Sequence, residues 1–358
     1  MKLLICAPDI FSGDAVGNHC LGLARTARRL GLDVQLYAQG YDAGTPDIRP
    51  FDDLFARASK DDIVLLSYSI YEPFLERLLK LDCRKICYFH GVTDPQLLRD
   101  LEPRTAKFCE MALAQLPLLA RFDTVIANSD NTAKSISDVL NSMVVKIIPP
   151  VFADMPAFRR EPAVDRHVPA VPNMLVVGRV VPHKRIEDAI DILALLQQHK
   201  LDATLSIVGS SPNYEYLKFL INHARKLGVL GRVDFKGMLD DADLFECYDR
   251  ASVLLAMSRH EGFCVPVLEA MHFGKPVFVR GGTAAQEICL ANCVFPSEES
   301  LDVWASAISN PINGLSTTRQ IDSAYTSHAH NVLLRADDSV WRAILVDTDV
   351  TGETHDRS

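Results

Sequence analysis

Two basic side chains follow the apolar segment Met174–Val177. Gly178 and Arg179 come directly after this segment, and Lys184 lies five residues further on, just before a helical pattern. Ligands of open α/β sheets bind outside the carboxyl ends of the strands, so Arg179 and Lys184 are expected on a ligand-binding loop. An arginine fork and a lysine charge there suit a diphosphate, whose departure builds up negative charge. On this motif alone, two ordinary basic loop residues explain the pattern equally well.

A second group of polar residues lies in the segment Ser258–Ala270, which follows another apolar segment. Gly262 permits a sharp turn with exposed N–H groups, and Pro266 suits the first turn of a helix. The amino end of such a helix attracts anions. Glu261 before the helix and Glu269 inside it can contact different parts of one ligand. The two glutamates fit either a hydrolase with paired carboxylates or the recognition of hydroxyl groups, and their spacing does not decide between these.

Short apolar segments that alternate with helical patterns position these motifs. Such alternation predicts parallel sheets covered by helices on both faces. In the first half, strands are expected at Leu3–Ala7, Val34–Ala38, Ile63–Ser67, Lys85–Phe89 and Thr124–Asn128, and helices at Cys20–Leu30, Pro73–Leu81 and Lys107–Ala120.

A proline-rich stretch from Pro149 to Pro172 predicts a linker, after which the alternation restarts. Strands are expected at Met174–Val177, Ala203–Val208, Val233–Lys236, Val253–Met257 and Pro276–Val279, with helices at Ile186–His199, Tyr214–Leu227, Leu244–Asp249 and Val265–His272. Asn310–Asn331 fits a loop or a poorly patterned helix, and Val340–Val346 predicts a helix. The expected domains are residues 1–165 and 166–325, followed by a helical segment at 326–346 and a polar tail at 347–358.

Length and composition restrict the class of protein. The 358 residues are 48% hydrophobic and 23% charged, which predicts two globular domains and excludes a fibrous or disordered chain. The net charge of −9 argues against a nucleic-acid partner. No apolar segment approaches the roughly 20 residues that a membrane-spanning helix needs. Nine scattered cysteines and the absence of a signal-peptide pattern favour reduced thiols in the cytoplasm.

The motifs of the second half resemble those of the retaining glycosyltransferases with the GT-B fold, in the group called glycosyltransferase family 4. The matching residues are Gly178-Arg179, Lys184, Asp234–Gly237, Ser258, Glu261, Glu269, Gly274–Val277, Gly281-Gly282 and Glu287. The first half adds Ser12–Asn18, Tyr88–Gly91 and Ile126–Ser129. The resemblance implies two Rossmann-like, doubly wound domains that face a cleft, with the 326–346 segment packed back on the first domain.

The resemblance also implies roles for individual residues. Arg179 and Lys184 would neutralise the donor diphosphate, and Glu269 would bind the ribose hydroxyls. Glu261 would hold the transferred sugar, and His90 would contact that sugar from the other domain. From the residues alone, His90 at the end of an apolar strand is more simply a core histidine. Further donor contacts are implied for Gly13, Gly17, Gly178, Lys236, Gly237, Met238, Gly262, Phe263, Cys264 and Val265.

Two positions depart from the family pattern. Cys264 stands where the group often has glycine, and its side chain narrows the space above the sugar or restricts the backbone. The glycine loop runs from Gly13 to Gly17 without the adjacent pair of glycines that is common in the group. An altered donor preference is therefore expected from Cys264, and the resemblance extends less completely to the phosphate contacts of the glycine loop.

The resemblance implies a hexosyltransferase that retains anomeric configuration and needs no metal or cofactor. GDP-mannose is the first expectation for the donor and a UDP-sugar the second, with a saccharide or lipid-linked saccharide as acceptor. The expected pathway is bacterial polysaccharide or lipopolysaccharide biosynthesis in the cytoplasm, with peripheral attachment to the inner face of the membrane left open. A nucleotide-sugar epimerase or hydrolase of the same fold, or a non-catalytic nucleotide-sugar-binding partner, stays an alternative.

Overall fold

The computed structural model describes residues 1–42, 47–140, 143–152, 154–160, 171–313 and 318–347. Its contacts divide the chain into two compact units. Unit 1 contains Met1–Val92, Met111–Met155 and the described residues from Val332 onward, and unit 2 contains Thr93–Glu110 and Pro156–Asn331. The expected boundary between residues 165 and 166, and all of the expected tail except residue 347, lie outside the described residues. The two divisions differ at Thr93–Glu110 and at residues 156–160, both of which the sequence assigns to the first domain and the contacts assign to unit 2.

Unit 1 is built on a parallel sheet. Its described strands are β1 (Lys2–Ile10), β2 (Asp33–Tyr41), β3 (Ile48–Pro50), β4 (Ile63–Tyr68), β5 (Arg84–Phe89), β6 (Thr124–Ala127) and β7 (Val145–Ile147). They lie in the order β3-β2-β1-β4-β5-β6-β7, and each neighbouring pair is parallel. All six residues of β4 are buried, as expected for a central strand covered on both faces.

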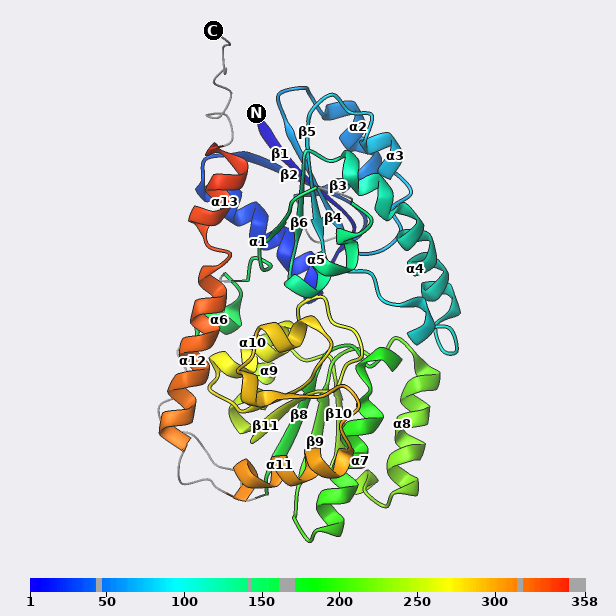
Figure 1. The fold of residues 1–358 in the computed structure, drawn as a ribbon, viewed down its shortest axis with the longest axis vertical. Helices are drawn as coiled ribbons and strands as arrows, with labels where there is room; N and C mark the ends of the chain where they lie inside the picture. Colours follow the sequence, from blue (N-terminus) through cyan, green and yellow to red (C-terminus); the bar gives the residue numbers. More distant parts are fainter. Residues whose placement is uncertain (43–46, 141–142, 153, 161–170, 314–317, 348–358) are drawn as a thin grey trace. The chain divides into compact units, whose positions relative to one another are not determined.

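Helices cover both faces of the unit 1 sheet (Figure 1). Side chains alternate between the faces of a strand, so β1 sends Leu3 and Ile5 to one core, and Leu4 and Cys6 to another. The first core is closed by α1 and α13, and the second by the helices α2 to α5. Their bounds are α1 (Ala15–Arg29), α2 (Leu54–Arg57), α3 (Leu75–Leu78), α4 (Pro103–Gln115), α5 (Asp130–Ser137) and α13 (Asp338–Leu345).

The last described helix belongs to unit 1. α13 packs against α1, and Trp341 is fully buried in the core that the two helices share (Figure 1). Arg29, near the end of α1, donates hydrogen bonds to Asp338 at 2.6 and 2.8 Å and to Asp154 at 2.6 Å. The sequence of Asn310–Asn331 fits either a loop or a helix. The described residues of this segment are mostly helical, because α12 runs over Thr318–Leu334.

Unit 2 repeats the parallel arrangement. Its described strands are β8 (Asn173–Val177), β9 (Thr204–Val208), β10 (Val233–Gly237), β11 (Val253–Ala256), β12 (Val277–Arg280) and β13 (Val294–Phe295), in the order β10-β9-β8-β11-β12-β13. Its helices are α6 (Pro156–Arg159), α7 (Ile186–Gln198), α8 (Tyr214–Lys226), α9 (Asp241–Arg250), α10 (Val265–His272) and α11 (Leu301–Asn313), and α12 crosses from unit 2 into unit 1 after Asn331. The five strands and four helices expected from residue 174 onward are all confirmed to within a few residues.

The helices of unit 2 form two layers around the sheet (Figure 1). Apolar side chains of α7, α8 and α11 share one core with the sheet, as shown by the buried Ile190, Leu220 and Trp304. α9 contacts β8 on the other side, and α10 contacts β11 and β12. Both layers leave the carboxyl ends of the strands for loops, which is where open α/β sheets bind ligands.

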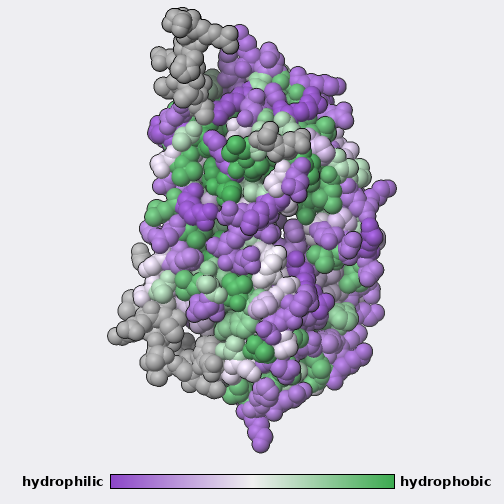
Figure 2. Space-filling model, in the orientation of Figure 1, coloured by the Kyte–Doolittle hydropathy of each residue, from purple (hydrophilic) through white to green (hydrophobic). Residues whose placement is uncertain are grey.

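The visible surface is mixed in polarity. Figure 2 shows hydrophilic side chains interspersed with smaller hydrophobic patches. The most exposed large hydrophobic side chains among the described residues, Val144, Tyr214 and Met238, belong to different segments of the chain. Among the described helices, none combines the length and the apolar character needed to cross a bilayer.

The burial of Trp341 generates a prediction about unit 1. Trp341→Ala should lower the free energy of unfolding by about 3–5 kcal/mol, because it removes a fully buried side chain between α1 and α13. Trp341→Phe is the matched control and should cost less, since it keeps an aromatic ring and removes an indole N–H that has no hydrogen-bond partner. Urea unfolding followed by circular dichroism measures both. Equal losses for the two variants would contradict the prediction.

Candidate functional site

Three glycines line the carboxyl edge of the unit 2 sheet. Gly178, Gly209 and Gly237 end β8, β9 and β10, with φ angles of 141°, 141° and 69°. A Cβ atom on Gly209 would lie 2.0 Å from the carbonyl oxygen of Gly178, so no side chain fits there. Backbone hydrogen bonds join the three ends, from Gly178 N–H to Val208 and from Gly209 N–H to Gly237. The sequence analysis missed Gly209, although a glycine directly after a buried strand was a usable signal.

Lys184 and Glu261 meet at this edge. The Lys184 Nζ atom donates a hydrogen bond of 2.6 Å to Glu261 Oε1, and Ser258 Oγ donates another of 2.6 Å to the same oxygen. Lys184 ends a short 3₁₀ turn after β8, whereas Ser258 and Glu261 follow β11. The structure therefore brings together two of the predicted site residues from separate motifs.

Burial and ion pairing shift the pKa values of Lys184 and Glu261 in opposite directions. Burial alone would lower the pKa of Lys184, but the Glu261 carboxylate outweighs it, and the net pKa of Lys184 is raised. Burial alone would raise the pKa of Glu261, but the charge and hydrogen bond of Lys184 outweigh it, and its net pKa is lowered. Both groups are therefore charged at neutral pH. A fixed positive and a fixed negative charge thus lie side by side where a ligand would bind.

Two histidines flank the pair, and the sequence analysis assigned neither a role. Burial lowers the pKa of His183 to about 3 and also lowers the pKa of His260. Their rings lie edge to face, with centroids 6.5 Å apart. The His183 carbonyl accepts a 2.8 Å hydrogen bond from the Arg259 N–H, which joins the loop after β8 to the loop after β11. His183 Nδ1 is buried without a hydrogen-bond partner.

Cys264 occupies a backbone conformation that favours glycine. It caps the amino end of α10 at φ 81° and ψ 70°, and its side chain is buried. Burial raises the pKa of its thiol well above the ordinary value, and the nearby Glu261 carboxylate adds to this. The thiol is therefore protonated at neutral pH. Gly262 and Phe263 precede it in the same loop, and Val265 starts α10, so these predicted donor-binding residues lie beside Glu261.

The remaining predicted cation, Arg179, follows Gly178 directly. Its side chain is exposed on the loop after β8. Lys184 reaches back over the same glycine, because a Cβ atom on Gly178 would lie 3.5 Å from both Nζ and Cε of Lys184. Arg179 and Lys184 therefore belong to one loop at the carboxyl end of β8.

Glu269 is buried inside α10. Its Oε2 accepts a 2.6 Å hydrogen bond from the Tyr248 hydroxyl of α9. Burial raises the pKa of Glu269 to about 7, although the Tyr248 hydrogen bond lowers it. Tyr248 was absent from the sequence analysis, because nothing in the pattern of α9 showed that it would meet α10. The Glu269 carboxyl group is therefore hydrogen-bonded to Tyr248 in this structure.

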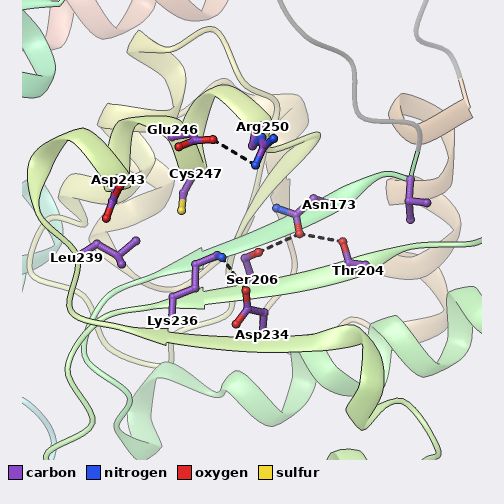
Figure 3. Close-up of a pocket in the computed structure, with 11 residues that line it drawn as sticks. Asn173, Thr204, Ser206, Asp234, Lys236, Leu239, Asp243, Glu246, Cys247 and Arg250 are labelled. Atoms are coloured by element: carbon purple, nitrogen blue, oxygen red, sulfur yellow. Dashed lines mark hydrogen bonds and ion pairs between the residues drawn. The ribbon is translucent and has the colours of Figure 1, made fainter.

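Lys236 lies in a groove beside α9 (Figure 3). The groove has a volume of about 650 Å³, and its lining includes Asn173, Thr204 and Asp234. Lys236 Nζ donates a 2.6 Å hydrogen bond to Asp234, so its charge is paired within the groove. The Thr204 hydroxyl donates a 3.0 Å hydrogen bond to Asn173 Oδ1 in the same groove. Asn173 and Thr204 begin their strands, so the groove extends away from the end of β10, where Gly237 and the exposed Met238 lie.

In unit 1, His90 follows β5 at the carboxyl edge of the sheet. Its Nε2 atom lies 2.6 Å from the buried Ser67 Oγ, and burial lowers its pKa to about 3. His19 of α1 lies beside it, with ring centroids 5.3 Å apart, and stacks on Tyr88 at 4.0 Å. His19 Nδ1 accepts a 3.1 Å hydrogen bond from Val151 N–H. His90 is thus a neutral hydrogen-bonding group, and the sequence analysis missed His19 and Ser67.

The glycine loop of unit 1 already holds a carboxylate. Asp14 caps α1 and accepts hydrogen bonds from the N–H groups of Val16 at 3.1 Å and Gly17 at 3.3 Å. Gly13 N–H donates to Asn18 Oδ1 at 3.1 Å. A Cβ atom on Gly17 would lie 2.0 Å from the Phe11 carbonyl oxygen. Gly17 therefore permits a close approach of two backbone segments, and a phosphate would have to displace Asp14 to reach these N–H groups.

A buried carboxyl group lies further along the same edge of unit 1. Glu72 follows β4 and is fully buried, and burial raises its pKa to about 7. It accepts hydrogen bonds from Gln39 Nε2 at 3.2 Å and Phe74 N–H at 2.9 Å. Sequence analysis gave no indication of this group. Across the part of the chain that the structure describes, no cluster of three or more His, Cys, Asp or Glu side chains is arranged to hold a metal ion.

Comparisons with known proteins show which family model and which proteins this chain is similar to. Residues 160–294 match the family model described as glycosyl transferases group 1. The chain is 24% identical over 262 residues to a serotype-specific mannosyltransferase, WbdA, of Escherichia coli, which covers 71% of this chain and 30% of WbdA. It is 29% identical over 219 residues to a GDP-mannose-dependent α-(1-6)-phosphatidylinositol dimannoside mannosyltransferase of Mycobacterium tuberculosis, which covers 57% of this chain and 55% of that protein. The chain therefore spans less than two thirds of either relative.

Solved structures match along nearly the whole chain. Sucrose-phosphate synthase of Thermosynechococcus elongatus superposes with a TM-score of 0.74 at 16% identity and covers 98% of both chains. Anabaena Alr3699/HepE in complex with UDP-glucose gives 0.73 at 18% identity, over 97% of this chain and 99% of that chain. At these identities the matches show the fold, which is the expected GT-B arrangement of two Rossmann-like domains.

The Lys184–Glu261 pair predicts a specific pH dependence of stability. Lys184→Met should lower the free energy of unfolding at pH 7 by about 3–5 kcal/mol, because it leaves a buried carboxylate unpaired. In the native protein the lowered pKa of Glu261 stabilises the fold above the ordinary carboxyl pKa, and this is lost as pH falls through the folded pKa. In Lys184→Met, burial raises the pKa of Glu261, because the compensating charge is gone. The loss of unfolding free energy relative to the native protein should therefore shrink on acidification.

Urea unfolding between pH 4 and pH 8 measures this effect. The matched control is the double variant Lys184→Met with Glu261→Gln, which removes both charges and should recover most of the loss. A deficit of the single variant that stays constant across this pH range would contradict the prediction.

The raised pKa of Glu269 predicts that its contribution to the free energy of unfolding falls as pH rises, which is opposite to the trend for Glu261. A carboxyl pKa of about 7 in the folded state means that stability present below the ordinary pKa of 4.5 is lost as pH rises through 7. Glu269→Gln can keep the Tyr248 hydrogen bond without titrating, so it should gain up to about 3 kcal/mol on the native protein between pH 5 and pH 8. Glu72 titrates in both proteins, so the difference isolates Glu269. Parallel pH profiles would show that Glu269 is not responsible.

Proposed function

We propose that this protein is a hexosyltransferase, because residues 160–294 match the model of the glycosyl transferases group 1 and the chain has the GT-B fold. It moves a hexose from a nucleotide diphosphate sugar to a saccharide or lipid-linked saccharide acceptor. The observation that carries this proposal is the contact of the half-buried Lys184 with the buried Glu261, beside the glycine-lined carboxyl ends of β8 and β9.

Unit 2 supplies the donor-binding groups in this proposal. Arg179 and Lys184 neutralise the diphosphate, and the amino end of α10 adds its partial positive charge. Glu261 accepts hydrogen bonds from sugar hydroxyl groups while Lys184 and Ser258 fix its position. Glu269 accepts hydrogen bonds from ribose hydroxyls, in competition with Tyr248. With these cationic groups in place, the reaction is proposed to need no metal and no cofactor.

The proposed chemistry retains the anomeric configuration. The bond between the anomeric carbon and the diphosphate oxygen breaks, and the acceptor hydroxyl oxygen forms a bond to that carbon on the same face. The proton of the acceptor hydroxyl passes to the departing phosphate oxygen. Glu261 acts by hydrogen bonding and charge in this scheme, and Lys184 stabilises the charge that develops on the leaving group.

Unit 1 is proposed to supply the acceptor-binding groups and, through His90, one contact to the transferred sugar. The neutral His90 suits hydrogen bonding to an uncharged sugar hydroxyl better than binding to a phosphate. The resemblance assigns His90 to the transferred sugar, and its place at the carboxyl end of β5 is consistent with that role. The Asp14 carboxylate on the glycine loop makes a hydroxyl ligand, rather than a phosphate, the better match there.

The names of the similar proteins support the choice of donor. Two of the relatives reported above are named mannosyltransferases, one of them GDP-mannose-dependent, so GDP-mannose is the first donor to test. A UDP-sugar is the second, because one matching structure is a complex with UDP-glucose. Another, WaaG, is named as involved in lipopolysaccharide biosynthesis. We place this protein in bacterial surface-polysaccharide synthesis in the cytoplasm, with peripheral membrane association as a further proposal.

Nucleotide binding tests the donor site. With UDP, GDP, ADP and dTDP, each at about 100 times a plausible dissociation constant, the matching nucleotide should stabilise the protein by roughly 2.7 kcal/mol. That corresponds to several degrees of melting temperature, at about 2–4 °C per kcal/mol. Arg179→Ala should abolish the shift without changing the unliganded melting temperature, because Arg179 is exposed. Arg225→Ala, an exposed arginine on α8, is the control and should keep the shift.

The outcomes separate the proposal from its alternatives. Binding of GDP alone favours GDP-mannose, and binding of UDP alone favours a UDP-sugar. Turnover of the matching sugar nucleotide without any acceptor would identify a hydrolase or an epimerase instead. A shift that Arg179→Ala leaves intact would refute the assigned diphosphate site.

A further inference from the structure

Arg280 is a buried arginine behind the candidate site. It ends β12, and only 3% of its surface is exposed. Its Nε donates a 2.9 Å hydrogen bond to the Met257 carbonyl, and its Nη1 donates another of 2.9 Å to the Ser297 carbonyl. Its Nη2 donates a 2.5 Å hydrogen bond to Asp188 Oδ2. One guanidinium therefore connects three separate segments of unit 2.

Two of these segments carry the candidate donor-binding residues. Met257 directly precedes Ser258 and the loop that contains Glu261. Asp188 lies in the first turn of α7, directly after the loop that contains Lys184. Asp188 also accepts hydrogen bonds of 2.7 and 3.2 Å from Arg185, which has a left-handed backbone with φ 53° and ψ 45°. Arg280 and Asp188 thus fix the backbone on both sides of the Lys184–Glu261 contact.

We propose that the buried Arg280–Asp188 ion pair is a positioning device for the donor site, which holds the Lys184 loop and the Glu261 loop in register. The inference rests on the proposed function, because it names residues that act through the donor-binding groups. Among the described residues, neither Arg280 nor Asp188 is hydrogen-bonded to Lys184 or Glu261, so both act indirectly.

The energetics of buried ion pairs distinguish positioning from stabilisation. Removing two charges from water costs much of what their attraction returns, so well-packed apolar replacements of a whole pair are often neutral in stability. A pair whose role is only to stabilise can therefore be replaced without loss of function. A pair that sets the geometry of two loops cannot, because displacement of catalytic groups by about 1 Å costs about 100-fold in rate.

The test replaces the whole pair in the double variant Arg280→Met with Asp188→Leu. We expect a folded protein whose melting temperature is lowered by the loss of two hydrogen bonds to backbone carbonyls, faster amide exchange at residues 178–186 and 257–264, and a fall of about 10- to 100-fold in kcat/KM for the sugar nucleotide. The control variant, Arg232→Gln with Asp202→Asn, removes an exposed ion pair next to the starts of β9 and β10. It should leave exchange in both loops and kcat/KM unchanged.

Each outcome decides the proposal. Native exchange rates in both loops, or faster exchange with native kcat/KM, would overturn it. If the double variant does not fold, Arg280→Lys keeps the charge beside Asp188 but cannot hold all three acceptors. It should then show faster exchange at 257–264 and reduced kcat/KM, and native values for both would overturn the proposal. Failure of the native protein to bind any nucleotide would refute the proposed function separately, since the exchange measurement needs no ligand.

Discussion

The burial of opposite charges at one edge of the second sheet is the constraint on which the candidate site depends. Lys184 and Glu261 would each lose hydration there, and their 2.6 Å contact compensates only when both loops are precisely placed. Glycine at the ends of β8 and β9 lets the loop after β9 approach the start of the Lys184 loop, because a side chain on Gly209 would overlap the Gly178 carbonyl. The left-handed backbone at Cys264 then lets α10 begin directly beside the pair.

The candidate site of unit 2 contains an ion pair with a buried carboxylate, whereas the buried groups described at the carboxyl edge of unit 1 are unpaired. At the carboxyl edge of unit 1, His90 and Glu72 lie without an ion-pair partner among the described residues, and burial shifts their pKa values toward the neutral forms. In unit 2, Lys184 and Glu261 stay charged because they are paired, whereas burial shifts the pKa values of His183 and Glu269 there toward the neutral forms. Paired charges suit a phosphate group, whereas neutral donors and acceptors suit sugar hydroxyls. This difference agrees with the proposed division into donor-binding and acceptor-binding units.

Sequence periodicity predicted most of the sheet but few of its long-range contacts. Strands of four or more residues were found because apolar runs identify them, whereas β3, β7 and β13, of two or three residues, carry too little pattern. Lys184 and Glu261 were both predicted as site residues, but a contact across 77 positions depends on how the loops pack. The partners Tyr248 and Arg280 were missed for the same reason. The capping role of Asp14 was local and was accessible to sequence reasoning.

The order of the segments in unit 1 has a consequence for synthesis on the ribosome. α13 completes the core around α1, yet Arg29 and its partner Asp338 are 309 residues apart. At 5–20 residues per second, α13 leaves the ribosome roughly 15–60 s after α1. The described part of unit 2 lies between α1 and α13 in the sequence, so it is synthesised within this interval. The nascent first unit therefore folds α1 onto its sheet without the part of the core that Trp341, Ile344 and Leu345 of α13 complete, until the second unit has been synthesised.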